Sequence, residues 1–379
     1  MLIVLHSSLA TYLDAGAVGQ GQAVEAFENI ALGRREGKHL LFGDRELFRR
    51  LTRFDRLSAG ARGTFNRVLA RFPQKRSLSL SLSRHIEVVA SDHGPLRWRT
   101  QGALKIAQVP IDCFRDSMLV QETVLLAENS RDTALYERMA EVGASTLKLG
   151  SIQIRAEGSG GGGNTTADEY GRYQASHRRL CLCVVDSDAK APGGTFGDTA
   201  RRVTEVDDTS QPLCEYSMTQ GRELENTIPT SLFSEVASGD RDRMEAVLFL
   251  ERLEGSPSAE ARNFLDLKHG TKLVHLLSHG EGSPERGYWE SHLPTFVSAA
   301  QLTDQRCVRA RTCRSPITCT CILTRGLGPH ILDDALNWIR RLSTPKLLET
   351  LCPHTRAEWL RLGQLILAWC CASERLSAI

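Results

Sequence analysis

The chain has 379 residues, of which 41% are hydrophobic and 24% are charged. This length allows two or three domains with a proper hydrophobic core, and no apolar stretch is long enough to span a membrane. The apolar start Met1–Leu5 lacks the basic flank of a signal sequence, so we expect a cytoplasmic protein without a membrane partner. The eleven cysteines are odd in number and scattered, which argues against a disulfide framework.

The net charge of +2 conceals an uneven distribution of charge along the chain. The segment Arg34–Arg84 carries fourteen lysines and arginines but four aspartates and glutamates, so the remainder is net acidic. This asymmetry suggests a basic segment that contacts nucleic acid or a regulatory partner, and an acidic remainder that holds cations. The basic residues are equally well explained as the solvent-exposed face of a helix without a binding role, because Arg45, Arg49 and Arg53 recur at helical spacing.

Residues 1–115 are predicted to form a mainly helical, basic domain that binds a partner or nucleic acid. Leu47, Phe48 and Leu51 recur at the spacing of one apolar helix stripe. The range Leu78–Val89 alternates more like a strand and ends near a turn signal.

Residues 116–275 alternate between strand and helix patterns, which predicts an α/β domain with a mostly parallel sheet flanked by helices. The expected strands are Leu119–Ala127, Leu147–Ala156, Leu180–Val185 and Leu213–Thr219. A glycine-rich turn is expected at Gly158–Asn164. Residues 276–379 are predicted to be a helical C-terminal region that completes or covers the α/β domain.

Acidic residues follow the ends of the expected strands. Glu128 ends the first strand, and Asp186 and Asp188 come directly after the third in chain order. Ligands bind beyond the carboxyl ends of parallel strands, and alternate residues of an extended segment point the same way. Two such carboxylates suit a hard cation such as Mg²⁺ or Mn²⁺.

The stretch Leu125–Asp132 resembles the first motif of Toprim domains, in which a strand delivers a glutamate and an acidic residue follows four positions later. Val184–Asp188 resembles the Asp-x-Asp motif that comes after it. The segment Arg222–Asn226 is similar to a glutamate-rich segment in the Toprim domains of OLD-family and related bacterial phage-defence nucleases. Lys268 resembles a lysine found further along such chains.

The resemblance implies a nuclease that depends on Mg²⁺ or Mn²⁺, with one or two ions, and that cleaves DNA or RNA in anti-phage defence. It implies catalytic roles for Glu128, Asp186, Asp188 and Lys268. The metal ligands that it implies are Glu128, Asp132, Asp186, Asp188, Glu223 and Glu225. OLD proteins carry an ATPase domain, whereas this chain has no phosphate-binding loop, so we expect a partner ATPase or sensor. Association of the chain with copies of itself, as a homo-oligomer, is a second possible interaction.

Other functions fit parts of the same pattern. Topoisomerases and primases also use Toprim domains, but the six tyrosines show no setting for a topoisomerase nucleophile. A non-catalytic interaction or sensor module is the alternative outside enzymes.

The cysteines near the C-terminus raise the question of zinc. The group consists of Cys307, Cys313, Cys319 and Cys321, with Cys352 or His354 as further candidates. Their spacings do not match the Cys-x2-Cys pairs of zinc knuckles, so we do not expect a structural zinc, and reduced thiols are the favoured interpretation.

Overall fold

The computed structural model describes residues 1–72, 81–313 and 319–376. The chain divides into two compact units, each built from discontinuous segments. The first unit contains Met1–Val184, Arg202–Ser217 and Leu360–Ile379, and the second contains Val185–Arg201 and Met218–Trp359. The sequence predicted three contiguous domains with boundaries near residues 115 and 275. Those boundaries remain predictions, because each observed unit combines segments that are separated along the chain.

The first unit begins with a five-stranded sheet in the order β2-β1-β3-β5-β4. Its strands are β1 (Leu2–Leu5), β2 (Leu40–Gly43), β3 (Arg84–Val89), β4 (Arg97–Gln101) and β5 (Leu104–Pro110). Only β4 pairs in the antiparallel sense within the described registers. The accompanying α-helices are α1 (Gln20–Arg35), α2 (Arg45–Arg53) and α3 (Ala59–Ala70).

This sheet is an addition to the N-terminal region, which was expected to be mainly helical and which does contain three α-helices. The predicted apolar helix stripe is present, because Leu47, Phe48 and Leu51 are buried on α2. The strands β1 and β2 have four residues each, which is too short to display the two-residue period from which strands are recognised. The range Leu78–Val89 was expected to be strand-like, and β3 forms its last part. Residues 78–80 of that range lie outside the described residues.

The first unit also contains a four-stranded sheet in the order β10-β9-β6-β8. Its strands are β6 (Thr123–Ala127), β8 (Ala156–Gly160), β9 (Cys181–Val185) and β10 (Cys214–Met218). β6 runs parallel to both β8 and β9. The predicted α/β class with a mostly parallel sheet flanked by helices is therefore confirmed.

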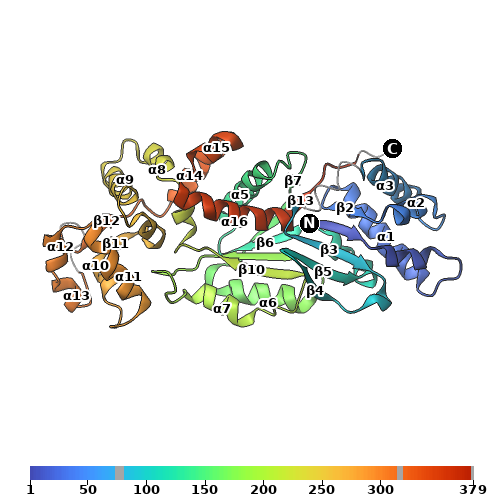
Figure 1. Cartoon of the computed structure of the whole chain (residues 1–379), viewed down its shortest axis with the longest axis horizontal. Helices are drawn as coiled ribbons and strands as arrows, with labels where there is room; N and C mark the ends of the chain where they lie inside the picture. The colour runs from blue at the N-terminus through green and yellow to red at the C-terminus, as the bar shows by residue number, and fades with distance from the viewer. Residues whose placement is uncertain (73–80, 314–318, 377–379) are drawn as a thin grey trace. The chain divides into compact units, whose positions relative to one another are not determined.

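Helices flank this sheet in the arrangement that its strand order requires. Helix α5 (Asp132–Thr146) connects β6 to β8, and α6 (Thr166–Ser176) connects β8 to β9. Because the two connections move across the sheet in opposite directions, right-handed crossovers place their helices on opposite faces. Figure 1 shows α5 and α6 on the two sides of the sheet.

The glycine-rich segment begins inside a strand, so the expected boundary between strand and turn was wrong. β8 runs to Gly160, whereas the predicted strand ended at Ala156. A Cβ atom on Gly158 would lie 2.9 Å from Thr133 Oγ1, and one on Gly160 would lie 2.6 Å from Ser130 N. Glycine is needed there because β8 passes against the start of α5, and a pattern of side chains does not reveal such a contact.

The described part of the second unit is mainly helical and contains a short antiparallel pair, β11 (Gly270–Lys272) with β12 (Ile322–Arg325). Its longer helices include α8 (Thr230–Ala237), α9 (Arg241–Glu254), α11 (Pro284–His292) and α14 (Ile331–Ile339). The C-terminal region was predicted to be helical, and on α14 the apolar residues Ile331, Ala335, Leu336 and Ile339 are buried. Within the described parts of the chain, no helix is both long and apolar enough to cross a membrane.

Candidate functional site

Ser187 anchors the acidic triplet that follows β9. Its N–H donates to Thr219 Oγ1 (2.9 Å) and its hydroxyl donates to the Gly221 carbonyl (2.6 Å). The Ser187 residue is 1% exposed, whereas Asp186 and Asp188 on either side are only half-buried. This pattern follows from the alternation of side chains along an extended segment, and it leaves both aspartate side chains partly exposed.

Main-chain hydrogen bonds bring three distant segments of the second unit together. The Asp188 N–H donates to the Arg222 carbonyl (2.8 Å), and the Arg222 N–H donates to the Asn263 carbonyl (2.7 Å). Asp188 itself lies in the left-handed region with a φ of 51°, a conformation that aspartate tolerates better than most residues. The triplet is thus joined to the glutamate-rich segment and to the segment that carries Lys268.

Ion pairs link the acids of these segments to two cations. Lys268 Nζ lies 2.8 Å from Glu225 Oε1, and the Glu225 side chain is 2% exposed. Arg222 Nε lies 3.1 Å from Glu223 Oε1, and Arg222 Nη2 lies 3.0 Å from Asp266 Oδ2. The predicted residues Glu223, Glu225 and Lys268 therefore belong to one charged cluster in the second unit.

Arg222 and Asp266 are members of this cluster to which the sequence assigned no role. A signal for Asp266 is present in the stretch Leu265-Asp266-Leu267-Lys268, where apolar and charged residues alternate. Leu265 and Leu267 are 0% and 2% exposed, so the alternation places Asp266 and Lys268 on the other side of the segment. Only the fold reveals that Arg222 lies beside them.

Burial changes the proton affinity of several groups in the cluster. Burial raises the pKa of Glu223 to about 7, although Arg222 opposes the shift. Glu223 Oε2 is buried without a hydrogen-bond partner among the described residues. Burial also raises the pKa of Asp188. Burial alone would lower the pKa of Lys268, but its ion pair with Glu225 outweighs that effect and raises it.

Glu128 and Asp132 lie in the first unit. Glu128 follows β6, and its carbonyl accepts hydrogen bonds from the N–H groups of Gly162 (3.0 Å) and Gly163 (3.3 Å). Asp132 Oδ2 accepts the Asn129 N–H at 3.1 Å, which supports the turn after β6. Because Asp186 and Asp188 belong to the other unit, a metal site shared with Glu128 remains a prediction.

Acidic oxygens do not converge on a single point in the described structure. Among the described residues, the group of possible metal-ligand atoms that lie within 4.8 Å of one another consists of the thiols of Cys307, Cys313 and Cys319. Arg222 and Lys268 pair with three of the acids. A bound Mg²⁺ or Mn²⁺ would therefore require some of these ion pairs to rearrange.

Comparison with known proteins gives no relative for this chain. No protein-family model, no curated protein and no solved structure matches it.

Proposed function

We propose that the protein is a nuclease that depends on Mg²⁺ or Mn²⁺ and hydrolyses phosphodiester bonds of DNA or RNA. The observation that carries the proposal is the joining of the Asp-Ser-Asp triplet to the Glu223–Glu225 segment through the hydrogen bond from Asp188 N–H to the Arg222 carbonyl. This bond supports a common site for acids that lie far apart in sequence. Glu128 is a further candidate ligand, to be tested by its own substitution.

The chemistry of the cluster suits a hard cation. Carboxylate oxygens are the ligands that Mg²⁺ and Mn²⁺ prefer, and Glu223 has a buried oxygen without a hydrogen-bond partner among the described residues. A bound divalent ion would polarise a phosphodiester and lower the pKa of an attacking water. Lys268 keeps its proton, because Glu225 holds the pKa of its ammonium above the ordinary value. It is thus suited to stabilise negative charge on a phosphate.

The test is a cleavage assay with the full chain, either metal ion, and single- and double-stranded DNA and RNA. We expect cleavage that chelation abolishes and that Asp186→Ala, Glu128→Gln or Lys268→Ala reduces by at least about 100-fold. Glu281→Ala is the matched control, because it removes an exposed acid of the second unit. Cleavage that persists in Asp186→Ala, or that does not need a metal ion, would contradict the proposal.

A non-catalytic interaction module is the second candidate, and the ion pairs favour it. Glu223, Glu225 and Asp266 already have cationic partners in Arg222 and Lys268, as expected for a charged scaffold. This candidate predicts stable binding to a partner ATPase or sensor with no cleavage under any metal condition. Copurification of the full chain with such a partner, followed by the same cleavage assay on the complex, separates the two candidates.

The basic segment of the first unit is our candidate for nucleic-acid binding. Arg45, Arg49 and Arg53 are exposed on α2, although Arg49 also pairs with Glu46. Arginines on an exposed helix face bind phosphates with an affinity that falls as salt rises. Charge-neutral glutamine variants of the three arginines should weaken nucleic-acid binding and flatten its salt dependence.

A further inference from the structure

Three cysteines of the second unit gather around one point, and a fourth, Cys321, follows two residues after the last of them. Cys307 lies on α13 (Arg306–Arg309), Cys313 follows it, and Cys319 and Cys321 precede β12. The sulfur atoms of Cys307 and Cys319 are 3.5 Å apart, and those of Cys307, Cys313 and Cys319 all lie within 4.8 Å of one another. Cys321 is a buried free thiol that lies outside this group of three. Thiols from separate segments therefore face a common centre.

The spacing of these sulfur atoms matches a shared metal ion. Zinc–sulfur bonds of about 2.3 Å in a tetrahedron place the sulfurs roughly 3.8 Å apart, close to the 3.5 Å between Cys307 and Cys319. A disulfide would require an S–S distance of about 2.05 Å, and all four cysteines are free thiols here.

A main-chain N–H group is directed at one of the sulfurs. The Val274 N–H donates to Cys321 Sγ at 3.4 Å. Such a donor stabilises a thiolate that ligates a metal and fixes its orientation. The Cys321 backbone is held as well, because its carbonyl accepts the Leu273 N–H at 2.7 Å. The site is therefore supported from the segment that follows β11.

We propose that Cys307, Cys313, Cys319 and Cys321 bind one Zn²⁺ ion as four thiolates. Each thiol releases its proton to solvent as its zinc–sulfur bond forms, so binding becomes tighter as pH rises. Four protein ligands fill the tetrahedral shell and leave no position for a substrate, so the site is structural. This proposal goes beyond the nuclease function and does not depend on it.

The zinc would stabilise the segment that holds Lys268. Cys321 directly precedes β12, and beyond β12 the Leu327 N–H donates to the Leu267 carbonyl (2.8 Å) and the Gly328 N–H to the Lys268 carbonyl (3.1 Å). Gly326 is needed at this contact, since a Cβ atom on it would lie 2.3 Å from the Lys268 carbonyl oxygen. β12 also forms one wall of a cavity, and α9 forms the opposite wall.

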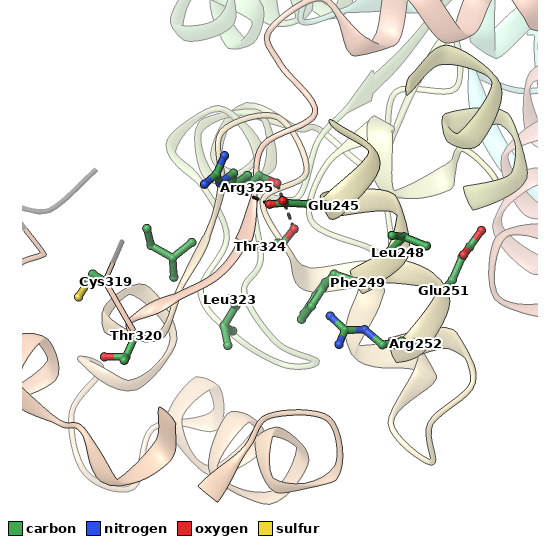
Figure 2. A pocket seen from close by; sticks show the side chains of 11 residues that line it. Glu245, Leu248, Phe249, Glu251, Arg252, Cys319, Thr320, Leu323, Thr324 and Arg325 are labelled. Carbon is green, nitrogen blue, oxygen red and sulfur yellow. Dashed lines mark hydrogen bonds and ion pairs between the residues drawn. The ribbon is translucent and has the colours of Figure 1, made fainter. Parts of the chain in front are cut away.

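Figure 2 shows this neighbourhood. Cys319 and Thr320 lead into β12, and Leu323, Thr324 and Arg325 lie on the side of the cavity that faces α9. The cavity has a volume of about 850 Å³. Loss of an ion that fixes the start of β12 would therefore loosen both this wall and the backbone next to Lys268.

The experiment measures metal content in the full chain purified without chelators. We expect one Zn²⁺ per chain, released when a mercurial reagent titrates the thiols, and a large loss of zinc in Cys313→Ser and Cys319→Ser. Cys352→Ser is the matched control, because Cys352 is also a half-buried free thiol of the second unit but directly precedes α16 (Pro353–Cys370), away from β12 along the chain. It should keep its zinc.

A second measurement decides the matter if the serine variants do not fold. Wild-type protein reconstituted with Co²⁺ should show the sulfur-to-cobalt charge-transfer bands and intense visible bands of a tetrahedral thiolate site. Folded wild-type protein without zinc, a disulfide between Cys307 and Cys319, or iron in place of zinc would each overturn the proposal. None of these outcomes bears on cleavage by the acidic cluster, so failure here is distinguishable from failure of the nuclease proposal.

Discussion

The ammonium nitrogen of Lys268 lies 2.8 Å from a carboxylate oxygen of Glu225, whose side chain is 2% exposed, whereas the lysine side chain is 30% exposed. The pair is therefore asymmetric: Lys268 reaches solvent if it loses its partner, but Glu225 does not. Removing the partner of a buried charge is more costly than removing both charges, because the remaining charge lacks both solvent and a counter-ion.

Lys268→Met should lower the free energy of unfolding of the second unit by about 3 kcal/mol. The double variant Lys268→Met with Glu225→Gln should recover part of that loss, because no buried charge remains. Urea denaturation of the single and double variants measures both effects. Lys346→Met is the control, since the Lys346–Glu349 pair is 63% and 68% exposed and such pairs contribute little. Strictly additive losses in the double variant would refute the asymmetry.

Gly197 lies against the side chain of Asp188. A Cβ atom at position 197 would be 2.3 Å from Asp188 Oδ2 and 2.5 Å from Asp188 Cβ. Rotation of the carboxylate does not relieve the second contact, so the residue itself must move. We therefore expect Gly197→Ala to weaken Mn²⁺ binding by the second unit about 10-fold or more while the unit remains folded.

Gly287→Ala provides the control for this substitution. Gly287 lies on α11 in the same unit, and nothing is within 4 Å of a Cβ atom there. Alanine should stabilise the helix by about 0.5–1 kcal/mol and leave metal affinity unchanged. Calorimetric titration with Mn²⁺ and thermal denaturation measure the two properties. Equal metal affinity in both alanine variants would show that Asp188 does not contribute to binding.

Arg262 fixes the chain just after the candidate acids. Its guanidinium is 0% exposed, donates to the carbonyls of Asn226 and Ile228, and lies 2.7 Å from Glu254 Oε1. Arg262→Met leaves both carbonyls and the carboxylate without this partner, and we expect a loss of about 3–5 kcal/mol of stability.

Arg241→Met is the control for Arg262, because its side chain is 90% exposed and pairs with Glu245 at 3.5 Å. Its substitution should leave the unfolding midpoint nearly unchanged. Chemical denaturation of the two variants side by side makes the comparison. A similar midpoint for both would mean that the buried guanidinium does not stabilise the segment after Glu225.

The central strands and the acids next to them were predictable from the sequence. β6 and β9 are buried along their whole length, so β9 and the part of β6 after Thr123 each give an uninterrupted apolar run, and acidic residues follow directly. The apolar stripe of α14 was equally visible, because its positions repeat with the helical period. These features depend on neighbours in sequence, which is why a pattern along one chain reveals them.

Features that depend on contacts between distant segments were not predictable. Arg222 pairs with Asp266, and nothing local to either residue indicates the other. Cys307 and Cys319, whose sulfur atoms lie close together, were named as candidates for zinc but not favoured, because their spacing lacks the Cys-x2-Cys pattern. The N-terminal sheet was missed for another reason, since β1 and β2 are too short to show a period.

His85 should make the first unit sensitive to acid. It lies on β3, and burial, with a contribution from Arg99, lowers its pKa from 6.5 to about 4. The unfolded chain therefore binds a proton near pH 6.5 that the folded unit does not accept until about pH 4. Stability from this residue is complete above pH 6.5 and declines as pH falls toward 4, by about 3 kcal/mol in total.

Substitution of His85 isolates this contribution from that of the carboxylates. His85→Gln cannot take up the proton, so its free energy of unfolding should fall less steeply between pH 6.5 and 4 than that of the wild type. The difference in slope should approach about 1.4 kcal/mol per pH unit, which corresponds to one proton. His93→Gln, at an exposed position of the same unit, should keep the wild-type slope. Parallel curves for His85→Gln and the wild type would show that His85 is protonated equally in the folded and unfolded chains.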